Sequence, residues 1–224
     1  MKGKVYILIP AYNESKVISK VISDIKKQGF ENIIVIDDGS SDNTYEVAQK
    51  SGAKVLRHFI NRGKGAAVKT GLQACKILNA DYVITMDGDG QHESKDLNLI
   101  FNELKSGCDV VLGSRFLRQN EMPLPNRIFN YVANILTYFF YGIKVTDSQS
   151  GFRGYNKKAL NLIETQSEEY EFDTEVLREI SRHNLKFSEV PIMVYYTDYS
   201  RSKNRKQGFI NGLKTLYNII IKQL

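Results

Sequence analysis

Continuous apolar runs alternate with amphipathic stretches along the first half of the chain. Fully apolar runs, such as residues 5–9 and 33–36, are typical of strands that are buried on both faces. Apolar residues at a spacing of three and four predict helices between them. The predicted strands are 5–9, 33–36, 53–57, 82–84 and 109–113, and the predicted helices are 14–28 (capped by Asn13 or Ser15), 43–50, 63–78 and 94–105. This alternation predicts an α/β fold with a mostly parallel sheet and helices on both faces.

Polar clusters follow four of these strands, at the point where each strand ends. The clusters are residues 10–14, 37–38, 87–89 and 114–115. The carboxyl ends of parallel strands share one edge of a sheet, and ligands of such sheets bind outside that edge. We therefore expect the four clusters to converge on one site of the nucleotide-binding kind.

The segment from residue 87 to residue 92 reads Asp-Gly-Asp-Gly-Gln-His. If the preceding strand continued, Asp87 and Asp89 would lie on one face. Two carboxylates and the amide oxygen of Gln91 suit Mg²⁺ or Mn²⁺, which takes phosphate oxygens and water as its other ligands. An Asp/Gly-rich surface turn is the simpler alternative. The other three clusters at the same edge favour the metal.

Composition and charge narrow the choice of partners. The 224 residues are 42% hydrophobic, enough for one large domain or one domain with an appendage. The net charge of +6 favours an anionic partner, either a nucleotide or a phospholipid surface. Nucleic acid is the least favoured partner because we find no nucleic-acid motif.

Cys75 and Cys108 lack metal-type spacing and are expected to be reduced core residues. We identify no signal peptide and no membrane-spanning run.

The second half of the chain departs from strict alternation. A helix predicted at 126–141 has a broad apolar face and a narrow polar stripe of Arg127, Asn130, Asn134 and Thr137. Such a helix suits a membrane interface, where the stripe would face an acceptor phosphate. A core helix packed on the sheet is the alternative. A further helix is predicted from 171 to about 183, and a further strand at 190–196.

Six segments, most of them rich in Gly, Asp and other polar residues, follow one another along the chain, namely residues 9–14, 37–42, 61–65, 87–92, 113–116 and 147–153. In this order they resemble the motifs of family 2 glycosyltransferases, and most closely those of the dolichol-phosphate mannosyltransferase (polyprenyl-phosphate glycosyltransferase) branch. The resemblance implies a GT-A fold, a nucleoside diphosphate sugar such as GDP-mannose or UDP-glucose, Mg²⁺ or Mn²⁺, and inversion at the anomeric carbon.

The resemblance also implies a role for individual residues. Pro10, Ala11, Tyr12, Glu14 and Asp38 would hold the base and ribose, Lys64 the diphosphate, Asp87, Asp89 and Gln91 the metal, Arg115 and Arg127 the acceptor phosphate, and Ser202 with Lys203 would close over the diphosphate. Simpler alternatives stay open for three of these positions. Tyr12 could cover the sheet edge, Asp37 rather than Asp38 is the expected turn former, and Lys64 could belong to a plain helix start. We assign no role to His58.

The nature of the acceptor decides whether a general base is needed. A polyprenyl phosphate is already anionic and needs positioning by Arg115, whereas a sugar hydroxyl would need a base, for which Asp173 or Glu175 are candidates. The favoured function is hexose transfer to a polyprenyl phosphate. Transfer to a glycan hydroxyl is the alternative, and a non-catalytic nucleotide-sugar-binding subunit is a third possibility.

We expect a catalytic domain over residues 1–200, with a donor half at 1–115 and an acceptor half at 116–200. Residues 201–224 combine a basic segment with an amphipathic helix, which favours a lipid surface. The expected location is therefore the cytoplasmic face of a membrane, as a peripheral protein. A membrane-spanning partner subunit or a homo-oligomer remains possible.

Overall fold

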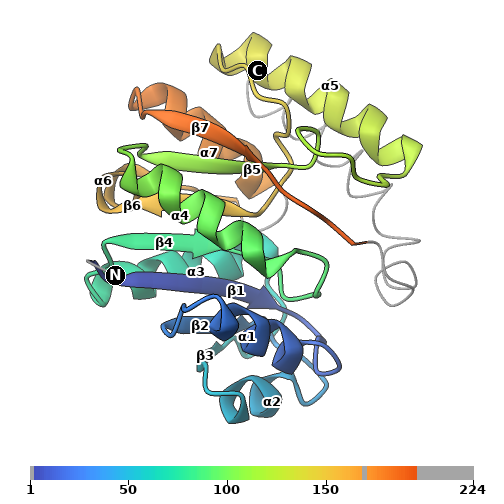
Figure 1. Ribbon diagram of the computed structural model, residues 1–224, viewed down its shortest axis with the longest axis vertical. Coiled ribbons are helices and arrows are strands. Elements are labelled where there is room, and N and C mark those ends of the chain that lie inside the picture. Colours follow the sequence, from blue (N-terminus) through green and yellow to red (C-terminus); the bar gives the residue numbers. More distant parts are fainter. Residues whose placement is uncertain (1–2, 168–170, 196–224) are drawn as a thin grey trace.

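A single mixed sheet organises the protein (Figure 1). The computed structural model describes residues 3–167 and 171–195. Within these ranges the sheet has seven strands in the order β3-β2-β1-β4-β6-β5-β7. The strands are β1 Val5–Ala11, β2 Ile33–Asp37, β3 Lys54–Arg57, β4 Tyr82–Thr85, β5 Val110–Ser114, β6 Arg153–Asn156 and β7 Phe187–Pro191. Only β6 among them runs antiparallel to its neighbours, β4 and β5.

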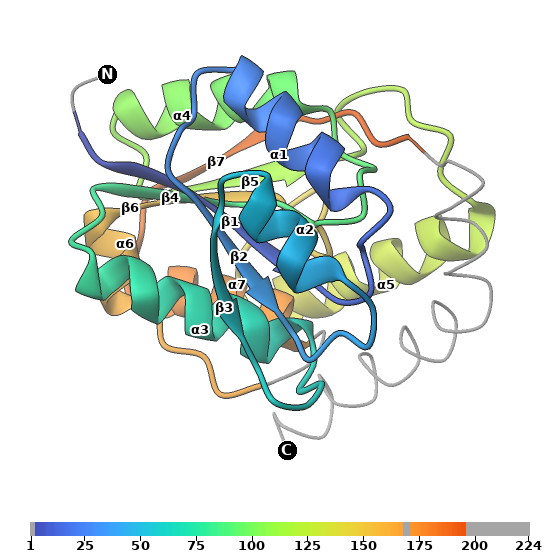
Figure 2. The ribbon, with the colours of Figure 1, turned by 90° about the horizontal axis from the view of Figure 1, so that it is seen from below.

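Helices cover both faces of the sheet, as the alternating pattern predicts. The helices are α1 Ile18–Lys27, α2 Thr44–Lys50, α3 Lys64–Ile77, α4 Leu97–Lys105, α5 Leu124–Tyr141, α6 Lys157–Leu162 and α7 Glu171–Arg182, and a 3₁₀ turn at Ser94–Asp96 precedes α4. Figure 2 shows α1, α2 and α4 on one face and α3, α6 and α7 on the other.

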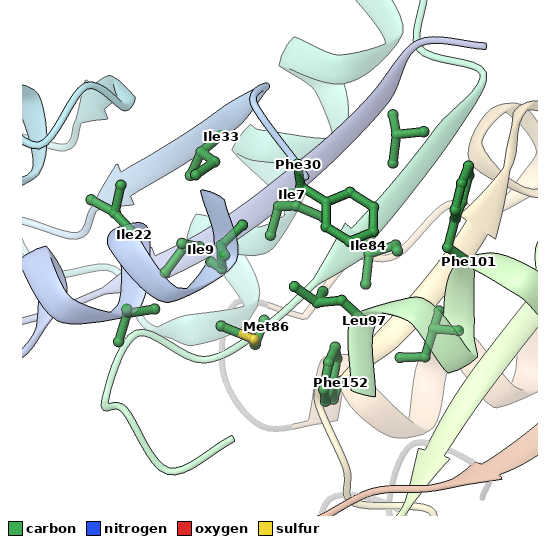
Figure 3. Packing of buried hydrophobic residues seen from close by; sticks show 14 of the residues in the cluster. Ile7, Ile9, Ile22, Phe30, Ile33, Ile84, Met86, Leu97, Phe101 and Phe152 are labelled. Carbon is green, nitrogen blue, oxygen red and sulfur yellow. The ribbon is translucent and has the colours of Figure 1, made fainter. Parts of the chain in front are cut away.

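Two apolar cores lie between these layers. Successive side chains of a strand point to opposite faces, so in β1 Ile7 and Ile9 enter the core beneath α1 and α4, whereas Leu8 enters the core beneath α3. Figure 3 shows Ile7 and Ile9 packed with Ile84, Phe101 and other residues of the first core. The two cores fix the ends of the strands, and with them the loops at the sheet edge.

Three local predictions were wrong. Helix α1 begins at Ile18, and neither Asn13 nor Ser15 caps it, because Val17 stands at the N-cap. Asn13 adopts a φ of 55° and its Oδ1 accepts a hydrogen bond from the Ser41 N–H. The strand predicted at 190–196 begins at Phe187 and ends at Pro191, and Val194 forms only an isolated bridge with His92. Strand β6 lies in a segment for which we predicted no strand.

Helix α5 lies to one side of the sheet (Figure 1) and turns Asn130, Asn134 and Thr137 of its polar stripe inward, whereas Arg127 is exposed. Asn130 and Thr137 are buried together with Ala133. The outer face exposes large apolar side chains, namely Leu124, Ile128, Tyr131, Val132, Ile135, Tyr138 and Phe139. The alternative of a core helix packed on the sheet is therefore wrong. Across 3–167 and 171–195, no helix has the length and apolarity that crossing a bilayer requires.

Candidate functional site

The loops that follow β1 and β2 are joined at the predicted edge of the sheet. The Asn13 N–H donates to Ser40 Oγ over 2.9 Å, and the Glu14 N–H donates to Thr44 Oγ1 over 2.8 Å. Pro10 and Ala11 form the buried end of β1, and Glu14 is also buried. Tyr12 is 42% exposed at the rim. The structure thus brings these four predicted donor-site residues together.

Asp37 and Asp38 have different surroundings. Asp37 Oδ1 accepts the Ser40 N–H at 3.0 Å, and its Oδ2 lies 3.1 Å from Arg57 Nε. Gly39, which lies in the same turn just before Ser40, has a φ of +70°, and a Cβ there would lie 2.5 Å from the backbone carbonyl carbon of Ile60. Only glycine fits at this position of the turn. Asp37 is therefore the turn former, as predicted.

Asp38 holds the segment that leads into α3. Its carboxylate accepts the N–H groups of Arg62 and Gly63 at 3.0 and 2.8 Å. His58 Nδ1 lies 2.6 Å from Asp38 Oδ1, and His58 Nε2 lies 2.9 Å from Thr70 Oγ1. We assigned no role to His58, and its spacing from Asp38 offers no local signal. The pair forms because β2 and β3 are neighbours in the sheet.

Lys64, the first residue of α3, reaches across to the loop after β4. Its Nζ lies 2.6 Å from Asp87 Oδ1, and His92 Nε2 lies 3.5 Å from Asp87 Oδ2. Burial alone would raise the pKa of Asp87, but Lys64 and then His92 outweigh it and hold this pKa below its usual value. Lys64 therefore serves as more than a plain helix start.

Asp89 lies in the same turn, beyond the end of β4. The strand stops at Thr85, so the two aspartates do not share a strand face. The Gln91 N–H donates to Asp89 Oδ1 over 3.0 Å, and the side-chain nitrogen of buried Gln91 has no hydrogen-bond partner. Burial, followed by the charge of Asp87, raises the pKa of Asp89. The charge of Asp87 disfavours ionisation of Asp89, and a divalent cation held by both carboxylates and the amide oxygen of Gln91 would relieve this repulsion.

The protein side chains would not complete the coordination of such a cation. Throughout the described part of the chain, no three His, Cys, Asp or Glu side chains are grouped closely enough to hold a metal ion. A cation at Asp87 and Asp89 would therefore take its other ligands from water and phosphate, as Mg²⁺ and Mn²⁺ do in nucleotide sites.

Arg115 is held by an aspartate that we had not singled out. Arg115 Nε and Nη2 donate to the two oxygens of Asp147 over 2.7 and 2.8 Å, and the Arg115 N–H donates to Asp147 Oδ2 over 3.0 Å. Asn130 of α5 donates to Asp147 Oδ1 over 2.5 Å. Burial raises the pKa of Asp147, but Arg115 outweighs this effect and the net shift is downward. Arg127 is exposed near the start of α5.

The two candidate general bases are engaged in structural contacts. Glu175 accepts the N–H groups of Gln166 and Ser167 and the Ser167 hydroxyl, over 2.8, 2.9 and 2.6 Å. Asp173 is 5% exposed and lies 3.5 Å from the guanidinium of buried Arg153. These contacts explain the acidic start of α7 without a catalytic role. Ser202 and Lys203 lie outside the described residues, as does the whole segment 201–224.

The inserted antiparallel β6 and the loops gathered at the strand ends define a GT-A fold, an α/β class that is found among nucleotide-sugar-dependent transferases. A family model described as glycosyl transferase family 2 matches residues 6–163. The chain therefore belongs to glycosyltransferase family 2, and the protein is a glycosyltransferase.

Two archaeal relatives match nearly the whole chain. An uncharacterized protein of Methanocaldococcus jannaschii is 40% identical over 100% of this chain and 93% of its own length. The UDP-N-acetylglucosamine–dolichyl-phosphate N-acetylglucosaminyltransferase of Methanococcus voltae is 33% identical over 98% of this chain and 96% of its own.

Solved structures with this fold include glucosyl-3-phosphoglycerate synthase of Mycobacterium tuberculosis. Its complex with Mn²⁺ and UDP-glucose superposes with a TM-score of 0.75, covering 99% of this chain and 79% of that one. The two sequences are 18% identical, so this likeness shows the fold alone.

Proposed function

We propose that the protein transfers a hexose or N-acetylhexosamine from a nucleoside diphosphate sugar to a polyprenyl phosphate at a membrane surface. The name of the Methanococcus voltae relative supports this acceptor class, since its match extends over almost all of both chains. The same name makes UDP-N-acetylglucosamine the first donor to test.

The orientation of α5 is the structural observation that carries the proposal. Its outer face exposes Tyr131 by 67%, Ile135 by 50% and Phe139 by 79%. A helix with a broad apolar outer face, with the exposed cations Arg127 in its first turn and Lys144 beyond its end, is suited to lie in the interface of an anionic bilayer. The lipid surface is therefore the partner we assign to this face.

The inner face of α5 contacts the segment that holds Arg115. Asn134 donates to the Thr146 carbonyl over 2.8 Å and accepts the Ser148 N–H at 3.0 Å, while Asn130 donates to Asp147. A bilayer against the outer face would thus bring a lipid phosphate close to Arg115. We propose that Arg115 orients this phosphate, with Arg127 assisting.

The chemistry needs a stabilised leaving group and a positioned nucleophile. A Mg²⁺ or Mn²⁺ ion held by Asp87, Asp89 and Gln91 would neutralise charge on the departing nucleoside diphosphate. Attack of a phosphate oxygen opposite the leaving group inverts the anomeric carbon. The polyprenyl phosphate is already an anion, so it requires no base, in agreement with the structural contacts of Asp173 and Glu175. Tyr12, Glu14 and Asp38 would hold the nucleoside.

The proposal is tested by transfer of radiolabelled sugar into organic-extractable lipid. Purified protein, Mn²⁺ and polyprenyl phosphate are mixed with UDP-N-acetylglucosamine, UDP-glucose or GDP-mannose in turn. We expect label in lipid from one donor, and loss of this label in Asp89→Ala. Absence of lipid label from every donor, with donor hydrolysis retained, would refute the lipid acceptor and favour a glycan hydroxyl.

Membrane binding is tested separately with anionic vesicles. We expect the paired variant Ile135→Asp and Phe139→Asp to stop floating with the vesicles and to lose lipid transfer. Ile77→Asp is the matched control, since Ile77 is 85% exposed at the end of α3, which leads back to the start of β4 and so lies away from the site edge. Equal flotation of both proteins would refute the role of α5.

A further inference from the structure

Lys64 and a divalent cation would compete for the same carboxylate. The ammonium lies 2.6 Å from Oδ1 of Asp87, one of the residues proposed above to hold the metal. We propose that Lys64 is an exchangeable counter-ion of the metal site, which leaves Asp87 for the donor diphosphate when the nucleotide binds. Metal binding and nucleotide binding would thereby be coupled through one side chain.

The Lys64 ammonium lies where three segments of the chain meet, namely the start of α3, the loop after β4 and the segment around Gly151. A Cβ at Gly151 would lie 2.5 Å from Lys64 Nζ and 3.3 Å from Asp87 Oδ1, so a side chain there would displace the ammonium. The Gly151 carbonyl accepts a hydrogen bond from the Thr85 hydroxyl over 2.7 Å, which holds Gly151 against the end of β4. The contact between Lys64 and Asp87 is therefore built into the site.

Charge balance explains why a cation lies beside Asp87. Asp87 and Asp89 place two negative charges in one turn, and the ammonium can neutralise one of them. A divalent cation would neutralise both, but an ammonium left at Asp87 Oδ1 would repel it. Lys64 therefore opposes metal binding as long as it stays on Asp87.

The nucleotide supplies a second place for the ammonium. Lys64 is the first residue of α3, which begins at the same edge as the metal loop. Its side chain is 25% exposed, so it has room to turn from Asp87 to a diphosphate bound beside the turn. A diphosphate carries enough negative charge to hold both the ammonium and the metal.

The exchange predicts opposite effects of one substitution on two affinities. Without nucleotide, Lys64→Met removes the competitor, and we expect about three- to tenfold tighter Mn²⁺ binding. With Mn²⁺ present, the same variant lacks a diphosphate contact, and we expect about tenfold weaker UDP or GDP binding. The factor by which the nucleotide raises the affinity for Mn²⁺ is therefore smaller in the variant than in the wild type. Thermodynamic linkage requires that the factor by which Mn²⁺ raises the affinity for the nucleotide decrease by the same amount.

The test measures Mn²⁺ binding from the EPR signal of the free ion, and nucleotide binding by calorimetry. Lys69→Met, which removes one positive charge from the same helix, should leave both affinities within about twofold. Thermal unfolding verifies that each variant is folded. Unchanged or weaker Mn²⁺ binding by Lys64→Met, or no Mn²⁺ binding by any of the proteins, overturns the proposal.

The inference rests on the proposed function only for the cation and the nucleotide. Neither measurement contains an acceptor. If lipid transfer fails while the two affinities change in opposite directions, the acceptor assignment is wrong and the exchange at Asp87 stands. If lipid transfer succeeds while both affinities fall, Lys64 has a structural role and the exchange is wrong.

Discussion

Asp147→Asn would leave the guanidinium of Arg115 without the carboxylate that it contacts through two nitrogens. Asp147 is 1% exposed, and the Arg115 side chain is 20% exposed. Breaking a buried pair costs about 3–5 kcal/mol, and the remaining exposure of Arg115 places the expected loss near the lower limit, at about 3 kcal/mol. For a protein of this size, that loss lowers the melting temperature by about 6–12 °C.

Urea unfolding of four proteins gives the assay: wild type, Asp147→Asn, Arg115→Met and the double variant. We expect a coupling free energy of at least about 1.5 kcal/mol, because each single variant removes the same contact between the guanidinium and the buried carboxylate. Asp24→Asn is the control, since its partner Lys20 is 83% exposed, and it should cost less than about 1 kcal/mol. Additive effects of Arg115→Met and Asp147→Asn would refute the argument.

The same pair predicts a pH dependence with a definite sign. Burial opposes the ionised form of Asp147, but Arg115 outweighs it, so the pKa of Asp147 in the folded protein lies below its ordinary value of 3.8. This ionised carboxylate therefore stabilises the fold fully above that value, and the stabilisation disappears as the pH falls through the folded pKa. The difference in free energy of unfolding between wild type and Asp147→Asn should be constant near neutral pH and should decrease below about pH 4.

Three further predictions concern single substitutions at Asp89, His58 and Glu175. Asp89→Asn removes repulsion with Asp87, so without metal it should melt no lower than wild type, while scanning fluorimetry should find that Mn²⁺ no longer raises its melting temperature. His58→Gln loosens the segment held by Asp38, so steady-state kinetics should give a donor KM about tenfold higher, with kcat within about threefold. Glu175→Gln should cost about 1–3 kcal/mol in urea unfolding and leave the transfer rate nearly intact, and a hundredfold rate loss at unchanged stability would instead identify a base.

The edge of the sheet was predictable because it depends on local patterns and one topological rule. Apolar runs such as 33–36 and 82–84 specify parallel strands, and parallel strands place their following loops side by side. The proximity of Asp38 to the start of α3, and of Lys64 to Asp87, follows from that rule.

Strand β6 was not predictable in the same way. Gly154 is a poor strand residue, and a charged residue such as Arg153 is rarely buried. Arg153 is nevertheless 1% exposed, because its guanidinium donates to the carbonyls of Ser148, Ser150 and Asp173. Such partners are known only when the segments before and after β6 are already placed.

The sequence pattern of α5 also did not determine which of its faces turns toward the protein. The periodicity identifies one polar and one apolar face, and either can face the protein. Asn130 and Asn134 face inward because Asp147, Thr146 and Ser148 offer them hydrogen bonds. The pattern of the helix contains no information about these partners, which lie beyond its end.

The position of β6 has a consequence for how the protein is made on the ribosome. Strand β5 belongs to the first half of the chain, yet its two neighbours in the sheet are β6 and β7. The strands from β1 to β4 can pair as soon as they leave the exit tunnel, whereas β5 must wait until β6 has been synthesised. From the time β5 leaves the tunnel until β6 follows it, both edges of β5 lack a strand partner, so a translational pause in that interval would expose the nascent chain to chaperones and to aggregation.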